Sequence, residues 1–304
     1  MPIYKNEKGK LGLIKEVPIK LERDLQKLTE ENLGLVFGLK FVCTEFSLHN
    51  SRIDSLAFDE ETNAFVIIEY KRERNFSVID QGFSYLSLML QNKAEFIQEY
   101  YERIGKNLTR SEVDWTQSRV IFISQSFTTY QQNAINFKDL PIELWEVNKY
   151  DNDTILYKQL KSSDRSESIN KISKNKTIES VSKEVKVYSV DDHVSGINKN
   201  IVDLFYSLRD MIMVLDDGIE ERAKKKYIAY RTQSAFLYLH LQQGQIKLHL
   251  IVPVDKLDDP KKMARDVTNV GHYGGGITEV LLNKEEDLNY VFNLIEQSYK
   301  KVIN

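Results

Sequence analysis

The fold depends on two stretches of sequence, Arg-Ile-Asp-Ser-Leu at residues 52–56 and Phe-Val-Ile-Ile-Glu-Tyr-Lys at residues 65–71. Both are rich in β-branched and apolar residues, and polar turn residues separate them, which predicts two strands joined as a hairpin. Side chains alternate between the faces of a strand, so Glu69 and Lys71 point one way and Tyr70 the other. Asp54 can approach Glu69 across the hairpin. The sequence therefore predicts two carboxylates and one ammonium group on one surface.

These side chains are those of a metal-dependent hydrolytic site. Mg²⁺ prefers oxygen ligands and keeps several waters, so we expect Asp54 and Glu69 to bind Mg²⁺ or Mn²⁺, with the Tyr70 carbonyl as a further ligand. A bound Mg²⁺ polarises a phosphodiester and lowers the pKa of an attacking water. Lys71 would position that water or offset charge on the phosphoryl group. An alternative interpretation also matches this pattern, namely a hairpin that carries charged residues at its open end and binds no metal.

The hairpin sits in a longer run of predicted elements. Leu21, Leu25 and Leu28 recur on one face of a predicted helix. The expected order is α-β-β-β-α-β-α-β, with helices over 19–32, 78–104 and 130–136 and strands over 40–46, 52–58, 65–71, 119–124 and 142–147. Strands that alternate with helices in this way indicate an α/β fold.

Residues of roughly 19–147 resemble the PD-(D/E)xK nuclease superfamily in this element order and in the two quoted stretches. The Arg-Ile-Asp strand is similar to that of mismatch- and branch-directed endonucleases of the NucS kind. The resemblance implies a restriction-endonuclease-like α/β core (αβββαβ) with a mixed sheet. It also implies a Mg²⁺-dependent deoxyribonuclease with Asp54, Glu69 and Lys71 as catalytic residues.

The resemblance adds two outlying residues to the site. Gln81 follows Lys71 by ten residues, and many members of that group carry a Gln near the metal there, with a Tyr a turn later, here Tyr85. Glu22 on the first helix matches a supporting acidic position and is a candidate outer metal ligand. Arg72 and Arg74 could contact phosphates or lie in a solvated loop.

DNA is the partner that the resemblance implies, in repair or in defence against foreign DNA. Many nucleases of this class pair to cut two strands, so a homodimer is expected. Two other interpretations stay open. The chain could be a non-catalytic protein that binds nucleic acid or protein through a nuclease fold. Alternatively, the function could lie in the C-terminal part.

The domain organisation is predicted from composition. The 304 residues suggest about two domains. Residues 160–186 are polar and net basic and lack aromatic residues and proline, so we expect a flexible linker there. The nuclease-like domain would then span 1–159, and a second, α+β domain 187–304. In that second domain we expect helices over 197–215 and 285–302, a short helix after Pro260 and a mainly antiparallel sheet.

The second domain resembles a domain family of unknown function that is often attached to predicted transport proteins. The carrying stretches are Tyr-Ile-Ala-Tyr at 227–230, Gly-His-Tyr-Gly at 271–274 and Leu-Ile-Glu-Gln-Ser-Tyr at 294–299. The last is also similar to the end of YjbR-type domains. We interpret this domain as a substrate- or partner-binding module. The glycine-rich loop 271–276 predicts a turn with positive φ, and His240 and His249 are expected to pack across a hairpin.

Composition excludes several classes. The single cysteine, Cys43, rules out an intrachain disulfide and favours a buried core position over a thiolate zinc site. The longest apolar runs are far shorter than a membrane span, and the N-terminus lacks a secretory apolar segment. We therefore expect a cytoplasmic protein without a membrane partner. Because the net charge of the chain is −3, a basic groove that binds nucleic acid would have to be a local feature of its surface.

Overall fold

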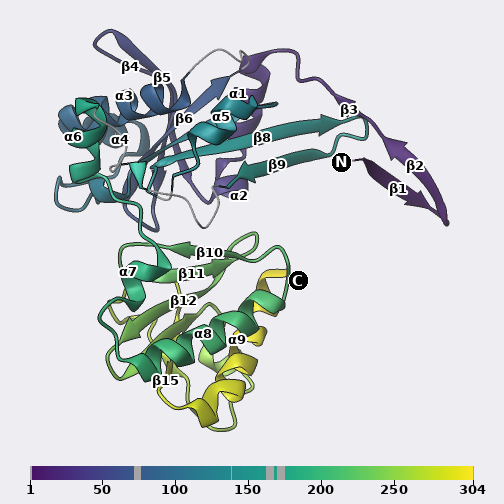
Figure 1. The fold of residues 1–304 in the computed structure, drawn as a ribbon, viewed down its shortest axis with the longest axis vertical. Coiled ribbons are helices and arrows are strands. Elements are labelled where there is room, and N and C mark those ends of the chain that lie inside the picture. The colour runs from purple at the N-terminus through teal and green to yellow at the C-terminus, as the bar shows by residue number, and fades with distance from the viewer. Residues whose placement is uncertain (1, 72–76, 138, 162–167, 170–174, 304) are drawn as a thin grey trace. The chain divides into compact units, whose positions relative to one another are not determined.

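The computed structural model describes residues 2–71, 77–137, 139–161, 168–169 and 175–303. They form two compact units, Met1–Val187 and Tyr188–Asn304 (Figure 1). Arg72 and Arg74 lie outside the described residues. Within the described part of the chain, no helix has the length and apolar character needed to cross a membrane.

A mixed seven-stranded sheet forms the base of the first unit. Its strands are β3 (Glu16–Val17), β4 (Lys40–Leu48), β5 (Ser51–Asp59), β6 (Ala64–Lys71), β7 (Arg119–Ser124), β8 (Ile142–Tyr150) and β9 (Ile155–Leu160). The order is β3-β8-β7-β6-β5-β4, with β9 paired to β8. β4, β5 and β6 are antiparallel, whereas β6, β7 and β8 are parallel. The expected mixed sheet is confirmed.

Helices cover both faces of this sheet, because β6 is apolar on both sides. Phe65 and Ile67 belong to one core, which includes residues of α3 (Val78–Gln91), α4 (Lys93–Ile104) and α6 (Lys176–Glu184). Val66, Ile68 and Tyr70 belong to the other core, together with α1 (Glu22–Glu31) and α2 (Leu33–Phe37). Residues of β6 that alternate in sequence therefore face α3 on one side and α1 on the other.

Several predicted elements differ from the structure. The helix expected over 78–104 is two helices, since the backbone of Asn92 is not helical and its Nδ2 donates to the Leu88 carbonyl at 2.7 Å. The helix expected from residue 19 begins at Glu22. Sequence analysis missed β9 and an exposed hairpin of β1 (Ile3–Glu7) and β2 (Lys10–Ile14). The short helix near 130–136 is α5 (Thr129–Ala134), held by a capping box at Thr128.

The linker expected over 160–186 needs correction. Within it, α6 buries Ile178 and Val181 in the core beside α3, and Ile169 and Val185 are also buried there. Residues 178, 181 and 185 recur at the helical spacing of three and four, so this mostly polar segment still has one apolar face. The first unit accordingly extends to Val187 instead of ending at residue 159.

The second unit has a six-stranded antiparallel sheet with two long helices, as expected for an α+β domain. Its order is β10-β11-β12-β13-β15-β14, and α8 and α9 pack their apolar residues against one face. No helix follows Pro260, where the structure instead has a turn and β14. The elements are α7 (Val190–Val194), α8 (Lys199–Val214), β10 (Glu220–Ala223), β11 (Ile228–Arg231), β12 (Ala235–Gln242), β13 (Gln245–Leu250), β14 (Arg265–Asp266), β15 (Thr278–Leu282) and α9 (Leu288–Ile303).

Candidate functional site

The predicted carboxylates meet where β5 and β6 separate. The registered pairing of the two strands ends at Ser55 and Ile68. Beyond it, Asp54 Oδ2 accepts a hydrogen bond from the backbone N–H of Tyr70 at 3.0 Å. The Asp54 side chain therefore takes the place of a ladder contact and lies next to Glu69, the neighbour of Tyr70.

Helix α3 closes the site from the side. Lys71 Nζ donates to Glu69 Oε1 at 2.7 Å, and Gln81 Nε2 donates to the same oxygen at 3.2 Å. Gln81 Nε2 also lies 3.2 Å from the Tyr85 hydroxyl, which donates to the Arg52 carbonyl at 3.3 Å. The structure thus joins β6 to α3 through Glu69 and joins α3 to β5 through Tyr85.

The surroundings of Asp54 and Glu69 disfavour the charged forms of both side chains. Burial raises the pKa of Asp54, while the Tyr70 N–H and Lys71 lower it. Burial and the nearby Asp54 charge raise the pKa of Glu69, while Lys71 lowers it. Glu69 is 3% exposed, and its Oε2 accepts no hydrogen bond from the described residues. A bound cation would stabilise the charged forms of these two neighbouring carboxylates and would give the buried Oε2 of Glu69 a partner.

A close helix–sheet contact positions Gln81. The next residue, Gly82, lies so near β8 that an added Cβ would stand 2.4 Å from Ile142 Cδ1. Only glycine allows this approach without movement of a neighbour. The glycine therefore lets α3 come close enough for Gln81 to contact Glu69.

Glu22 is not brought into this group. It is exposed at the start of α1, a helix that packs on the Tyr70 side of β6. Among the described residues no hydrogen bond or ion pair connects it to the site. Instead Gln26 and Glu30, one and two turns later, reach β5. Gln26 Nε2 donates to the Asp54 carbonyl at 2.9 Å, and Glu30 Oε1 accepts from the Ser55 hydroxyl at 2.5 Å.

Sequence analysis did not identify Gln26 and Glu30 as supports of the site. The available signal was their spacing, since residues 22, 26 and 30 form an i, i+4 polar stripe on one helix. Which of the three would reach a strand depends on where α1 crosses the sheet. That crossing is set by tertiary packing of Leu25 and Leu33.

The donor set suits a cation that keeps much of its water. Within the described ranges, no group of three or more His, Cys, Asp or Glu residues is arranged to hold a metal ion. Asp54 and Glu69 supply two carboxylates, and Mg²⁺ is often held by only one or two, with waters and substrate oxygens completing its shell. The free Oε2 of Glu69 fits that role. The Tyr70 carbonyl as a ligand stays a prediction.

Solved structures of repair endonucleases match part of the chain. One, from Pyrococcus abyssi, is 21% identical, with 39% of this chain and 44% of that chain covered and a TM-score of 0.22. The apo form of EndoMS is 17% identical, with 39% and 43% covered and a TM-score of 0.26. The match thus spans less than half of each of these chains. At such low TM-scores the likeness carries no argument about fold or activity.

Two comparisons by sequence reach further. Residues 190–301 match the model of a domain of unknown function, DUF5655, which coincides with the second unit. An uncharacterized protein from Haemophilus influenzae is 46% identical over 301 residues, which is 99% of this chain and all of the relative. The chain therefore belongs, over its whole length, to the same family as this Haemophilus influenzae protein, and its C-terminal unit is a DUF5655 domain.

Proposed function

We propose that the first unit is a nuclease that hydrolyses DNA phosphodiester bonds with Mg²⁺ or Mn²⁺. The observation that carries this proposal is that Asp54 and Lys71 lie next to Glu69, whose Oε2 is buried and accepts no hydrogen bond from the described residues. A purely structural ion pair would not need a second carboxylate beside Glu69, because the Asp54 charge raises the pKa of Glu69.

Each side chain has a distinct task in this proposal. Asp54 and Glu69 would hold the metal, which when bound supplies Lewis-acid activation of the phosphodiester and of the attacking water. Lys71 Nζ, already donating to Glu69 Oε1, is placed to donate also to a water or to a phosphoryl oxygen. Gln81 holds Glu69 Oε1 from α3, so that Oε2 stays directed away from both amide and ammonium.

The choice of DNA rests on the resemblance of the Arg-Ile-Asp and Glu-Tyr-Lys strands to NucS-like endonucleases. Repair or defence are the settings that fit such an activity. Pairing of two chains remains part of the proposal, because cutting both strands of a duplex needs two sites. The competing interpretation, a binding protein on a nuclease fold, requires no metal at Asp54 and Glu69.

The test is cleavage of labelled DNA in single-stranded, duplex, branched and mismatched form, with Mg²⁺, with Mn²⁺ and with a chelator. The variants are Asp54→Asn and Lys71→Met. Matched controls are Asp153→Asn, an exposed aspartate of the same unit, and Lys40→Met, a lysine of the same sheet that pairs with the exposed Glu60.

Metal-dependent cleavage lost in both site variants and kept in both controls is the expected result. Calorimetry with Mn²⁺ gives a second readout, since Asp54→Asn should abolish binding, whereas Lys71→Met should keep it. Absence of cleavage on every substrate, together with absence of Mn²⁺ binding by the unmodified chain, would refute the enzyme and favour the binding protein.

A further inference from the structure

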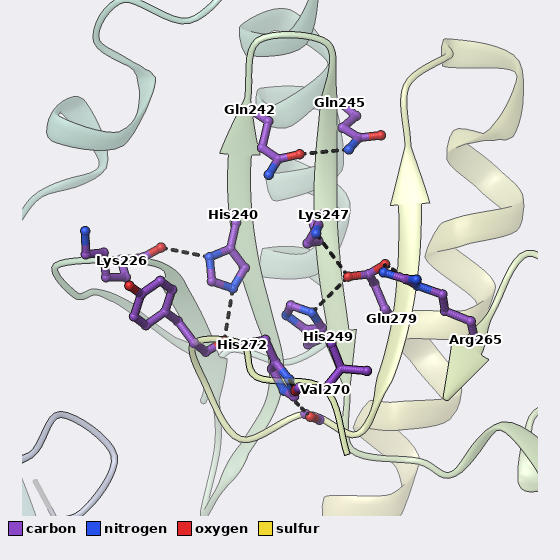
Figure 2. Close-up of polar contacts among 12 residues, drawn as sticks. Lys226, His240, Gln242, Gln245, Lys247, His249, Arg265, Val270, His272 and Glu279 are labelled. Atoms are coloured by element: carbon purple, nitrogen blue, oxygen red, sulfur yellow. Dashed lines mark hydrogen bonds and ion pairs between the residues drawn. The ribbon is translucent and has the colours of Figure 1, made fainter. Parts of the chain in front are cut away.

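The second unit carries a polar cluster on the sheet face that α8 and α9 do not cover. On β12 and β13, the leucines that alternate with the cluster belong to the helix-covered core. His240 pairs with Lys247, and His249 pairs with Glu279 of β15. Because paired residues share a face, these four side chains lie together, and Figure 2 shows them converging.

His249 is the centre of this cluster. It is 1% exposed, yet neither of its ring nitrogens has a hydrogen-bond partner among the residues that the structure describes. Its Nε2 is 3.4 Å from Glu279 Oε2, but that carboxylate also pairs with Lys247 at 3.2 Å and with Arg265 at 2.6 Å. Leaving a buried polar ring without a hydrogen bond is energetically costly. Such a group in a native fold indicates a missing partner.

Two more histidines flank it. His272 stacks on His249 with ring centroids 4.4 Å apart, and His240 meets it edge-on at 5.1 Å. The nitrogens of His240 lie 2.8 and 3.1 Å from the carbonyl oxygens of Lys226 and Tyr273. Those of His272 lie 2.7 and 2.6 Å from two further carbonyl oxygens. A neutral imidazole has one N–H, so only the imidazolium form donates at both positions.

The cluster is therefore arranged for positive charge. Its one carboxylate, Glu279, faces two fixed cations, Lys247 and Arg265. The Lys226 and Tyr273 carbonyls partly offset the burial that lowers the pKa of His240, and Lys226 Nζ lies 5.5 Å from the centroid of the Tyr273 ring. Because both nitrogens of each flanking histidine face carbonyl oxygens, neither ring has a lone pair left for a metal.

A glycine-rich loop lies directly on the cluster. A Cβ at Gly276 would stand 2.5 Å from His249 Cβ, and one at Gly274, where φ is +88°, would stand 2.7 Å from the Tyr238 ring. The predicted positive φ is thus confirmed at Gly274. The loop carries His272 and Tyr273, so its movement would uncover His249 and change the contacts of both flanking histidines.

We propose that this face of the DUF5655 unit binds a small phosphate-type oxyanion beneath the 271–276 loop, with His249 as its buried donor. A phosphate group accepts several hydrogen bonds and carries the charge that this cationic cluster lacks. This proposal does not depend on the nuclease proposal, because all of its residues belong to the second unit.

Proton uptake accompanies binding. Burial and the neighbouring His240 and His272 lower the pKa of His249 to about 4, and burial lowers the pKa of His240. A bound anion favours both imidazolium forms and so raises both pKa values. The other charged groups facing these rings are Lys247, Arg265 and Glu279, together with Lys226 and His193. Affinity is therefore expected to decrease as pH rises.

The test uses the full chain labelled with ¹⁵N-histidine, followed by NMR during titration. Inorganic phosphate is the first probe. Two pairs then separate sources of the same chemistry: AMP against adenosine, and a 5′-phosphorylated DNA oligonucleotide against the unphosphorylated one. The proposal expects the phosphorylated probe of at least one pair, or phosphate itself, to shift the His249 ring signals, with affinity lower by about tenfold or more at pH 8 than at pH 6.

Variants locate the site. His249→Gln and Arg265→Met should each weaken binding by about tenfold or more. Arg265 has a largely exposed side chain, so its variant should fold even if His249→Gln does not. The control His49→Asn removes a histidine from a turn of the first unit, at φ +52°, a conformation that asparagine tolerates. Absence of binding by every phosphorylated probe at pH 6, or equal binding by Arg265→Met, would overturn the proposal.

Discussion

Replacing Gly82 by alanine tests how closely α3 must approach the sheet. The added methyl group would lie 2.4 Å from Ile142 Cδ1 and 2.8 Å from Cγ1. Non-bonded carbons prefer about 3.5–4.0 Å, so the tip of Ile142 must move by about 1 Å. Overpacking of this size costs about 1–3 kcal/mol. Alanine returns about 0.5–1 kcal/mol in a helix interior, so the expected net loss of stability is about 0–2.5 kcal/mol.

A second substitution checks that the clash is the cause. Ile142→Val removes Cδ1, the atom nearest the new methyl group, and alone should cost about 0.5–1.5 kcal/mol. If Gly82→Ala is destabilising because of this contact, the two substitutions together should cost less than their sum by about 1 kcal/mol.

Fluorescence-detected unfolding in urea measures these values for the right unit, because both tryptophans, Trp115 and Trp145, lie in the first unit. In thermal unfolding, 1 kcal/mol corresponds to about 2–4 °C in a unit of this size. Strictly additive substitutions, or a Gly82→Ala variant more stable than the unmodified chain, would refute the close-contact argument.

Three other outcomes are expected. Because burial raises the pKa of Asp54 and Glu69, Mn²⁺ affinity should fall with decreasing pH as these carboxyl groups protonate, and calorimetry showing no dependence between about pH 8 and pH 5 would contradict this. Arg119→Met removes the cation that pairs with the largely buried carboxylates of Asp59 and Glu143, and should cost about 3–5 kcal/mol in urea unfolding. Burial raises the pKa of the Cys43 thiol to about 12, so a thiol reagent should label it only on unfolding, whereas rapid labelling in native buffer would argue against burial.

The strands of the first unit were predictable because their apolar patterns are local. Both faces of β6 are buried, and its sequence is continuously apolar up to Glu69. The division of the long helix at Asn92 had weaker signals, since neither proline nor glycine marks it. The β1–β2 hairpin was not predicted because its apolar residues, such as Leu11 and Leu13, are exposed and do not form a buried face.

The candidate site was predictable from local pattern only for its residues on strands, while Gln81 and Tyr85 of α3 followed from the family resemblance. Asp54, Glu69 and Lys71 meet because strand alternation and hairpin register are set by nearby residues. Glu22 was placed by analogy with a helix position, and the turn of α1 that reaches β5 depends on packing far from it in sequence. In the second unit the expected packing of His240 against His249 is confirmed, whereas His272 was missed because it comes from a loop without sequence periodicity.

The packing of α6 decides where the gene can be divided. A recombinant fragment that stops near residue 160 would lose the buried side chains of Ile178 and Val181. Its α3 would then expose an apolar surface, which favours self-association. A fragment that stops at Val187 keeps α6, which covers this apolar surface. The DUF5655 match begins at residue 190, just past this point. The boundary between the two units thus lies after α6. The C-terminal unit could therefore be separated, or fused to another protein, without removing core residues from the first unit.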